Sequence, residues 1–285
     1  RVLWHVGCNF GSLDNKFTLD KSEKCYENGI AHFLEHKLFE LEDGQDVSEL
    51  FTNAGANSNA FTTFDKTCFY FSTIDHLNEN LDLLQHFVAD TAFTDESIER
   101  EKSIISQEID MYQDDADYRL YQGILENLYP QTALAQDIAG TQESIANISV
   151  VDLKENHDVF YSPQEMTLLV VGNFDKEDIF KQIQESQKEK NKAAHHLERQ
   201  ELDYESVVPK ASVQMEVTQP KLAIGLRGPI LPEGESTLRQ ELALRLFFAM
   251  ILGWTSRCYQ ELYENGQIDD SFDFEIEVLS KFSNF

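Results

Sequence analysis

The feature that most constrains the fold of this chain is the segment of residues 29–39, which reads GIAHFLEHKLF. If the segment is helical, steps of about 100° per residue place His32, Glu35 and His36 on one face of the helix. The isoleucine and the two leucines fall on the opposite face. The sequence therefore predicts a helix that packs an apolar side against a core and presents two imidazoles and a carboxylate on the other side.

The spacing of these two histidines is suited to metal binding. Side chains four residues apart lie one turn above the other, so His32 and His36 can hold one ion from a single helix. The letters HFLEH also match the inverted zinc-peptidase pattern H-x-x-E-H. The alternative is a pair of hydrogen-bonding or surface histidines, because chance produces such a pattern in roughly a few of every hundred chains of this kind. A catalytic zinc site needs three protein ligands and an open position for water, so a third ligand is expected elsewhere.

A second predicted helix, over residues 96–113, offers that ligand. On a helical wheel Glu101 and Glu108 lie within a stripe of isoleucines and one tyrosine. Carboxylates rarely point into a core unless a partner or a metal compensates the cost of desolvation. A buried Arg or Lys is the alternative partner, but the chain has 23 basic residues against 51 acidic ones. At least one of the two glutamates is therefore predicted to belong to a metal site.

Together, HFLEH and the later E-x6-E pair resemble the pitrilysin/insulysin family of zinc metallopeptidases, which includes the mitochondrial processing peptidases. The resemblance implies that Zn2+ is bound by His32, His36 and Glu108. It implies that Glu35 is the general base and that Glu101 is an auxiliary catalytic glutamate, which supports the site without binding the metal. Zinc would leave a position for water and lower its pKa, while Glu35 takes the proton and passes it to the leaving amine.

The resemblance extends to residues 55–62, GANSNAFT, and to residues 129–140. It implies that Asn59 and Ala60 present backbone groups to the substrate and that Phe61 and Phe39 line side-chain pockets. A peptide would add as a strand along the edge near residues 58–62. For both phenylalanines, packing in the core is the alternative.

Composition excludes some classes of partner. The net charge of −28 argues against nucleic acid, because phosphate contacts need Lys and Arg. No run of 18 apolar residues is present, so no membrane partner is expected. The four cysteines show no paired spacing, which favours free thiols and a cytoplasmic location.

The order of predicted elements suggests two related αβ domains. A strand, two helices and a strand over residues 2–73 are followed by further helices and by a very apolar segment, residues 166–172, which is predicted to be a central strand buried on both faces. After a charged stretch, the order of strand, two helices and strand is repeated, and the helices of this repeat contain no histidine. The expected elements of this repeat are strands over residues 221–227 and 271–279 and helices over residues 236–252 and 256–264.

We therefore expect an α+β fold in which each domain is a mainly antiparallel sheet covered by helices. Residues 1–187 would form the catalytic domain, residues 188–220 a linker, and residues 221–285 the start of a second, inactive domain. Because Arg1 enters a strand-like run at once and the second domain stops early, the native polypeptide is expected to extend beyond this stretch.

The expected function is that of a zinc metalloendopeptidase acting on peptides or unfolded segments. Two alternatives stay open: a noncatalytic scaffold or processing subunit that retains a zinc site, and a zinc-dependent module that binds a partner protein. Short members of the resembling family imply a homodimer, or a heterodimer with a homologous subunit.

Overall fold

A computed structural model describes the chain over residues 2–41, 44–91, 93–187, 196–230 and 234–285. The chain divides into two compact units. The first unit comprises residues 1–122 and 131–200, and the second comprises residues 123–130 and 201–285. Helices combine with antiparallel strands in both units, which confirms the predicted α+β class.

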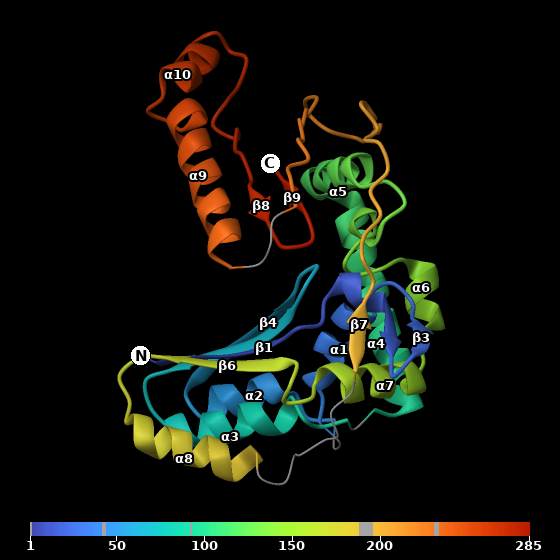
Figure 1. Ribbon diagram of the computed structural model, residues 1–285, viewed down its shortest axis with the longest axis vertical. Helices are drawn as coiled ribbons and strands as arrows, with labels where there is room; N and C mark the ends of the chain where they lie inside the picture. The colour runs from blue at the N-terminus through green and yellow to red at the C-terminus, as the bar shows by residue number, and fades with distance from the viewer. Residues whose placement is uncertain (1, 42–43, 92, 188–195, 231–233) are drawn as a thin grey trace. The chain divides into compact units, whose positions relative to one another are not determined.

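The first unit is built on a four-stranded antiparallel sheet with the strand order β4-β5-β1-β6. The strands span Val2–Cys8 (β1), Ala56–Thr62 (β4), Thr67–Thr73 (β5) and Met166–Val171 (β6). Buried residues alternate with less buried ones along β1, as expected for a strand with one face against a core. Figure 1 shows the sheet with helices on one of its sides.

Three helices cover the buried face of this sheet: α1 (Ile30–Leu38), α2 (Val47–Asn53) and α3 (Leu77–Phe87). The core between the sheet and the helices is rich in aromatic rings. Phe71 of β5 stacks on Trp4 of β1 with ring centroids 5.9 Å apart and on Phe51 of α2 at 5.3 Å. This aromatic packing fixes the helix layer on the sheet.

A longer helix, α4 (Asp95–Asp114), packs against α1. Its start is defined by a capping box, in which Thr94 Oγ1 accepts from Ser97 N while Ser97 Oγ accepts from Thr94 N, both at 3.2 Å. The other helices of the first unit are α5 (Ala116–Leu128), which continues into the second unit, α6 (Gln142–Asn147), α7 (Val150–Phe160) and α8 (Lys176–Gln187), with short 3-10 turns η1 (Ser12–Asn15) and η2 (Ala133–Ala135).

A small second sheet in the first unit has the order β3-β2-β7, with β2 at Lys16–Leu19, β3 at Ser22–Cys25 and β7 at Leu197–Arg199. Arg199 of β7 binds the buried carboxylate of Asp14 at 2.9 Å and Glu165 at 2.8 Å. β7 lies within the range expected to be a linker, so this sheet is a difference from the predicted order of elements.

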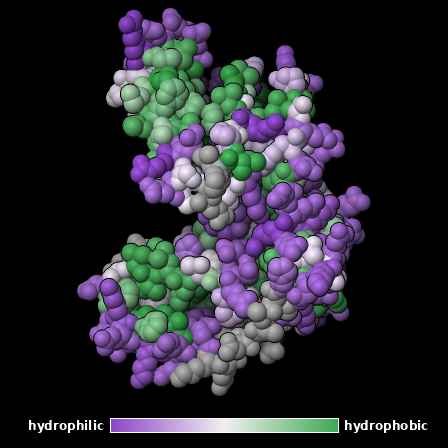
Figure 2. All heavy atoms as spheres, viewed as in Figure 1, coloured by the Kyte–Doolittle hydropathy of each residue, from purple (hydrophilic) through white to green (hydrophobic). Residues whose placement is uncertain are grey.

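The second unit contains α9 (Glu235–Leu252), α10 (Arg257–Glu264) and a two-stranded sheet of β8 (Glu277–Val278) and β9 (Ser283–Asn284). Inside this unit, the buried Tyr129 donates to the carbonyl of Ser283 at 2.7 Å. Figure 2 shows hydrophobic side chains gathered over α9, which buries none of its residues. None of the helices within the described ranges combines the length and hydropathy that a membrane span requires.

Four of the predicted strands differ from the observed structure. The second strand predicted within residues 2–73, expected over residues 58–73, is instead a hairpin of β4 and β5, because Thr63 N donates to Lys66 O at 2.8 Å and closes a turn. β6 is an edge strand with alternate residues exposed, not a central strand buried on both faces. Residues 221–227 form only a single bridge from Arg227 to Asn284, and residues 271–279 pair only through Glu277 and Val278.

Candidate metal centre

Helix α1 begins at a close approach between two loops. Gly29 caps the helix in the left-handed region, with φ of 90°, and a Cβ built there would lie 2.6 Å from the carbonyl oxygen of Ala139. Only glycine fits this conformation and this contact without strain. The helix then buries Ile30, Phe33 and Leu34 against the core.

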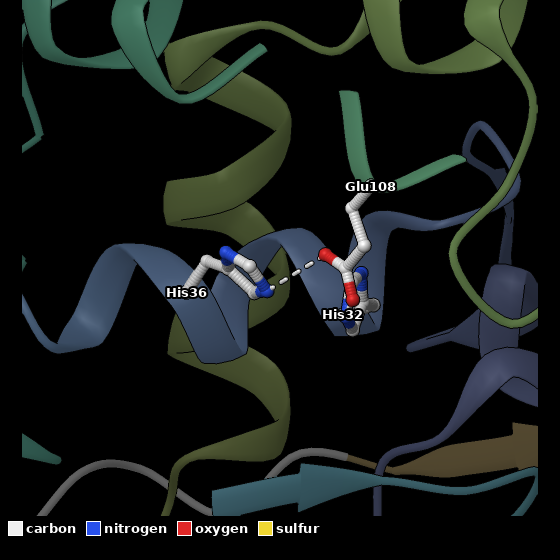
Figure 3. Close-up of side chains that lie close together, drawn as sticks. All are labelled: His32, His36 and Glu108. Atoms are coloured by element: carbon white, nitrogen blue, oxygen red, sulfur yellow. Dashed lines mark ion pairs between the residues drawn. The ribbon is translucent and has the colours of Figure 1, made fainter. Parts of the chain in front are cut away.

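The other side of α1 carries the histidines. His32 Nε2 lies 3.8 Å from Glu108 Oε1, and His36 Nε2 lies 3.4 Å from Glu108 Oε2. Figure 3 shows both rings of α1 turned toward the Glu108 carboxylate, which projects from α4. Ligand atoms of these three residues all lie within 4.8 Å of one another, and no other such group of His, Cys, Asp or Glu is found among the described residues.

These three side chains fit a zinc ion by their chemistry and by their spacing. Two imidazoles and one carboxylate are a common protein ligand set for catalytic zinc. With bond lengths of about 2.0–2.1 Å, the ligand atoms of a tetrahedral zinc ion lie about 3.4 Å apart. His36 Nε2 lies 3.4 Å from one oxygen of Glu108 and His32 Nε2 lies 3.8 Å from the other, and both separations are close to that value. Because the protein supplies three donors, a fourth position is left for water or substrate.

Glu101 lies on the same face of α4, two turns before Glu108. Its buried carboxylate is 2.9 Å from His36 Nδ1, on the side of the ring away from Glu108. Histidines that bind metals usually donate their second ring nitrogen to a carboxylate, which sets the tautomer and the ring orientation. This contact therefore leaves Nε2 of His36 as the nitrogen that faces Glu108.

The protonation of the two histidines is shifted in opposite directions. Burial, followed by the neighbouring His36, lowers the pKa of His32 below its ordinary value. Burial alone would also lower the pKa of His36, but the hydrogen bond and charge of Glu101, together with Glu108, outweigh it and raise that pKa. The directions differ because the ring of His36 has a hydrogen bond to a carboxylate, whereas burial dominates at His32.

Glu35 is the third polar residue on this face of α1. Its Oε2 accepts a hydrogen bond of 2.6 Å from Thr62 Oγ1 at the end of β4. Burial raises the pKa of Glu35, and the bond from Thr62 partly offsets that rise. Thr62 belongs to the stretch that matches the family, but the sequence did not indicate a role for it. The signal was available in the alternation along β4, which places Thr62 on the same face as Ala60 and opposite to the exposed Phe61.

An ion-pair clamp holds the far end of α1 against α4. Lys37, which is 0% exposed, places its ammonium 2.5 Å from Glu40 Oε2, and the other oxygen of Glu40 binds the guanidinium of Arg100. Arg100 immediately precedes Glu101 in the chain. The clamp therefore helps to keep the face of α4 that carries the glutamates opposite His36.

The predicted substrate-binding residues lie on two different surfaces. Phe39 packs on Phe87 at 5.4 Å and on Phe69 at 5.9 Å, which favours the core alternative for that ring. Asn59, Ala60 and Phe61 lie on β4, an edge strand of the sheet. Phe61 is 39% exposed and points to the face of the sheet away from the helices, with its ring centroid 6.4 Å from that of His5.

Two further groups near the site were not assigned a role from sequence. Tyr112, predicted to be part of the apolar stripe, donates its phenol to Glu108 Oε1 at 2.5 Å. Tyr118 donates to Asp137 at 2.8 Å. Burial and the hydrogen bond to Glu108 raise the pKa of Tyr112 above its ordinary value, so the phenol stays a donor. The signal available in the sequence was the spacing of four residues between Glu108 and Tyr112 on one helix.

The fold and the three converging side chains define a class: α+β proteins with an inverted histidine motif and a candidate metal centre. Known proteins lead to the same class. The chain is 34% identical to an M16-like peptidase from Alicyclobacillus acidocaldarius whose crystal structure it matches with a TM-score of 0.92, over 99% of this chain and 67% of that one. The family described as Insulinase (Peptidase family M16) matches residues 21–142, and the Peptidase M16 inactive domain matches residues 147–285.

Curated relatives carry names of the same kind. The chain is 41% identical over 272 residues to the uncharacterized zinc protease YmfH of Bacillus subtilis, which covers 93% of this chain and 63% of that protein. It is 26% identical over 160 residues to the probable mitochondrial-processing peptidase subunit beta of Arabidopsis thaliana, covering 55% of this chain and 30% of that one. The chain thus spans less than two thirds of the length of these curated relatives.

This chain belongs to the insulinase family, peptidase family M16, and the predicted pitrilysin-like resemblance is confirmed. The expectation of two αβ domains of this family is confirmed as well.

Proposed function

We propose that this protein is a zinc-dependent endopeptidase that hydrolyses peptides or unfolded segments of proteins. The observation that carries the proposal is the convergence of His32 and His36 with Glu108, while Glu35 shares the same face of α1. The name of the relative YmfH, a zinc protease, supports this reaction class.

His32, His36 and Glu108 would hold the metal, and Glu101 would orient the His36 ring. Zinc, when bound, would supply the Lewis acidity that activates water and polarises the scissile carbonyl. Glu35 would accept the proton of the attacking water and deliver it to the leaving amine. Burial suits Glu35 to this exchange because it raises the pKa of the carboxyl toward the working pH.

The free edge of β4 offers a place for an extended substrate. A peptide that adds beside Asn59 and Ala60 would pair through its main chain, which holds it extended with little demand on sequence. Phe61, exposed at the same strand, would contact a substrate side chain. Phe39 would contact the substrate only through the exposed part of its ring, since the rest of the ring packs against the core.

The organisation of the whole protein also belongs to this proposal. We infer a catalytic domain over residues 1–187, a linker over 188–220 and a second, inactive domain from residue 221. A homodimer or a heterodimer with a homologous subunit is supported by the relative that is named as a subunit of a processing peptidase. Four free cysteines favour a reducing compartment such as the cytoplasm.

The experiment is metal analysis of the native-length protein beside a chelator-sensitive assay on a library of fluorogenic peptides. We expect about one zinc per chain and cleavage that stops with chelator and returns with zinc. Glu35→Gln should keep the zinc and lose roughly 100-fold or more of the hydrolysis, because it removes the base without removing a ligand.

A matched control is Glu99→Gln, because Glu99 lies on α4 but pairs with Lys102 at the surface. It should change neither zinc content nor turnover. Full activity in Glu35→Gln would contradict the role of that residue. Stoichiometric zinc with no cleavage of any peptide would instead favour the noncatalytic scaffold, and capture of an uncleaved partner would favour the binding module.

A further inference from the structure

Tyr112 lies one helical turn after Glu108 on α4 and contacts the same carboxylate that faces the histidines. Its phenol donates to Glu108 Oε1 at 2.5 Å. Glu108 Oε2 is then the oxygen nearer to His36, at 3.4 Å from Nε2. A carboxylate can only accept hydrogen bonds, and a phenol is a donor at neutral pH, so the direction of this bond is set by chemistry.

The ring of Tyr112 is itself held in place. It stacks on Tyr118 of α5 with centroids 4.5 Å apart and an angle of 10° between the planes. Tyr118 in turn donates to Asp137 Oδ1 at 2.8 Å, and the same oxygen accepts from the backbone N of Ala139 at 2.9 Å. The phenol that holds Glu108 is therefore restrained by contacts on α5 and on the loop before α6.

That loop returns to the start of α1. A Cβ built on Gly140 would lie 2.6 Å from the carbonyl oxygen of Asn28, the residue before the Gly29 cap. The contacts thus form a closed path from Glu108 through Tyr112, Tyr118 and the loop to the helix that carries the histidines. Helices α1 and α4 are therefore connected through Tyr112, Tyr118 and this loop, in addition to the contacts of Glu108 with the two histidines.

We propose that Tyr112 is a positioning residue for Glu108: it engages Oε1, the oxygen that faces His32, and so sets the orientation in which the carboxylate presents Oε2 to His36. This inference rests on the proposed zinc site. Its consequence is that the Glu108 carboxylate is already oriented in the protein without metal, so that metal binding need not order it. The stacked Tyr118 and Asp137 act on the site through Tyr112.

Tyr112→Phe tests this directly, because it removes the hydroxyl and keeps the stacked ring. Zinc affinity, measured by competition with a chromophoric chelator, should fall about 10- to 100-fold, the range for removal of a group that orients a metal ligand. In protein loaded with Co2+, the visible absorption should also change, because Glu108 Oε1 would no longer be held by the phenol and the carboxylate could contact the ion differently. A purely structural role would leave that spectrum unchanged.

Three controls make the test specific. Tyr26→Phe removes a phenol-to-carboxylate bond of the same kind, to Glu155 at 2.6 Å, and should change neither affinity nor spectrum. Replacement of Tyr112 by 4-aminophenylalanine keeps a ring and a donor, and it should restore most of the affinity even if the Phe variant is poorly folded. Tyr118→Phe keeps the stack and should give a smaller loss than Tyr112→Phe.

The outcomes separate this inference from the proposed function. Wild-type affinity and spectrum in Tyr112→Phe, in a protein that binds zinc and cleaves peptides, would overturn the role of Tyr112 alone. Equal losses in the Phe and 4-aminophenylalanine variants would overturn it as well, because the donor would then be irrelevant. A wild-type protein that binds no zinc would overturn both proposals.

Discussion

Helices α1 and α9 show two ways in which an apolar helix can be used in one chain. In α1 the apolar side is buried, and the polar side faces two glutamates and a second helix. In α9 no residue is buried, and leucine, phenylalanine and methionine side chains are exposed along its length. The cluster of possible metal ligands that includes the histidines of α1 has no counterpart among the described residues of the second unit.

The difference shows that the H-x-x-E-H motif alone does not orient the polar side chains of α1, which also need partners outside the helix. Three polar groups of α1 have partners outside the helix: Glu101 for His36, Thr62 for Glu35 and, just beyond the end of α1, Glu40 for Lys37. Glu40 is itself bound to Arg100 of α4. The ion pairs of α9 are instead within the helix, Arg239 with Glu235 and Arg245 with Glu241. Pairs four residues apart stabilise a helix without fixing it against anything else.

The largest effect should come from the ligand itself. Glu108→Gln removes the carboxylate that we propose as a metal ligand, and zinc affinity should fall well over 100-fold by chelator competition. Glu101→Gln removes only the charge behind His36, for which a loss of roughly 10- to 100-fold is typical. Glu241→Gln, on α9, should change nothing. Equal losses at the two α4 glutamates, or a larger one at Glu101, would mean that the ligand and the supporting residue are assigned in the wrong order.

The next effect tests burial. Leu34→Ala in α1, where the side chain is 0% exposed, should lower the free energy of unfolding by about 3 kcal/mol, because it leaves a cavity in the core. Leu242→Ala in α9, 56% exposed, should cost less than about 0.5 kcal/mol. Urea titration followed by circular dichroism in the far ultraviolet, which records the helices of both units, measures both losses. Similar losses for both variants would contradict the contrast between the two helices.

The smallest of the three effects concerns the clamp. Glu40→Gln leaves the buried ammonium of Lys37 without its carboxylate, and it should destabilise the first unit by about 2 kcal/mol in the same titration. The double change Lys37→Met with Glu40→Gln should recover part of that loss, because the buried charge is then gone. A double variant less stable than Glu40→Gln would show that the ion pair is not the source of the cost.

The sequence by itself determined the features that depend on local periodicity. The spacing of three to four residues places His32, Glu35 and His36 on one face of α1, and the same rule places Glu101 and Glu108 in the apolar stripe of α4. A buried carboxylate needs a partner, so the pairing of the two helices could be anticipated from those glutamates. The α+β class followed from the order of helical and strand-like segments.

Only the tertiary structure decided the features that depend on pairing between distant segments. Whether residues 166–172 lie at the centre or the edge of a sheet depends on which strands flank them, and no periodicity records that choice. The small sheet of β3, β2 and β7 joins segments about 180 residues apart. By sequence alone, Tyr112 could belong to an apolar stripe or serve as a hydrogen-bond donor, because a phenol has both an apolar body and a polar tip. Its role is set by the positions of the Tyr118 ring on α5 and of Glu108 Oε1.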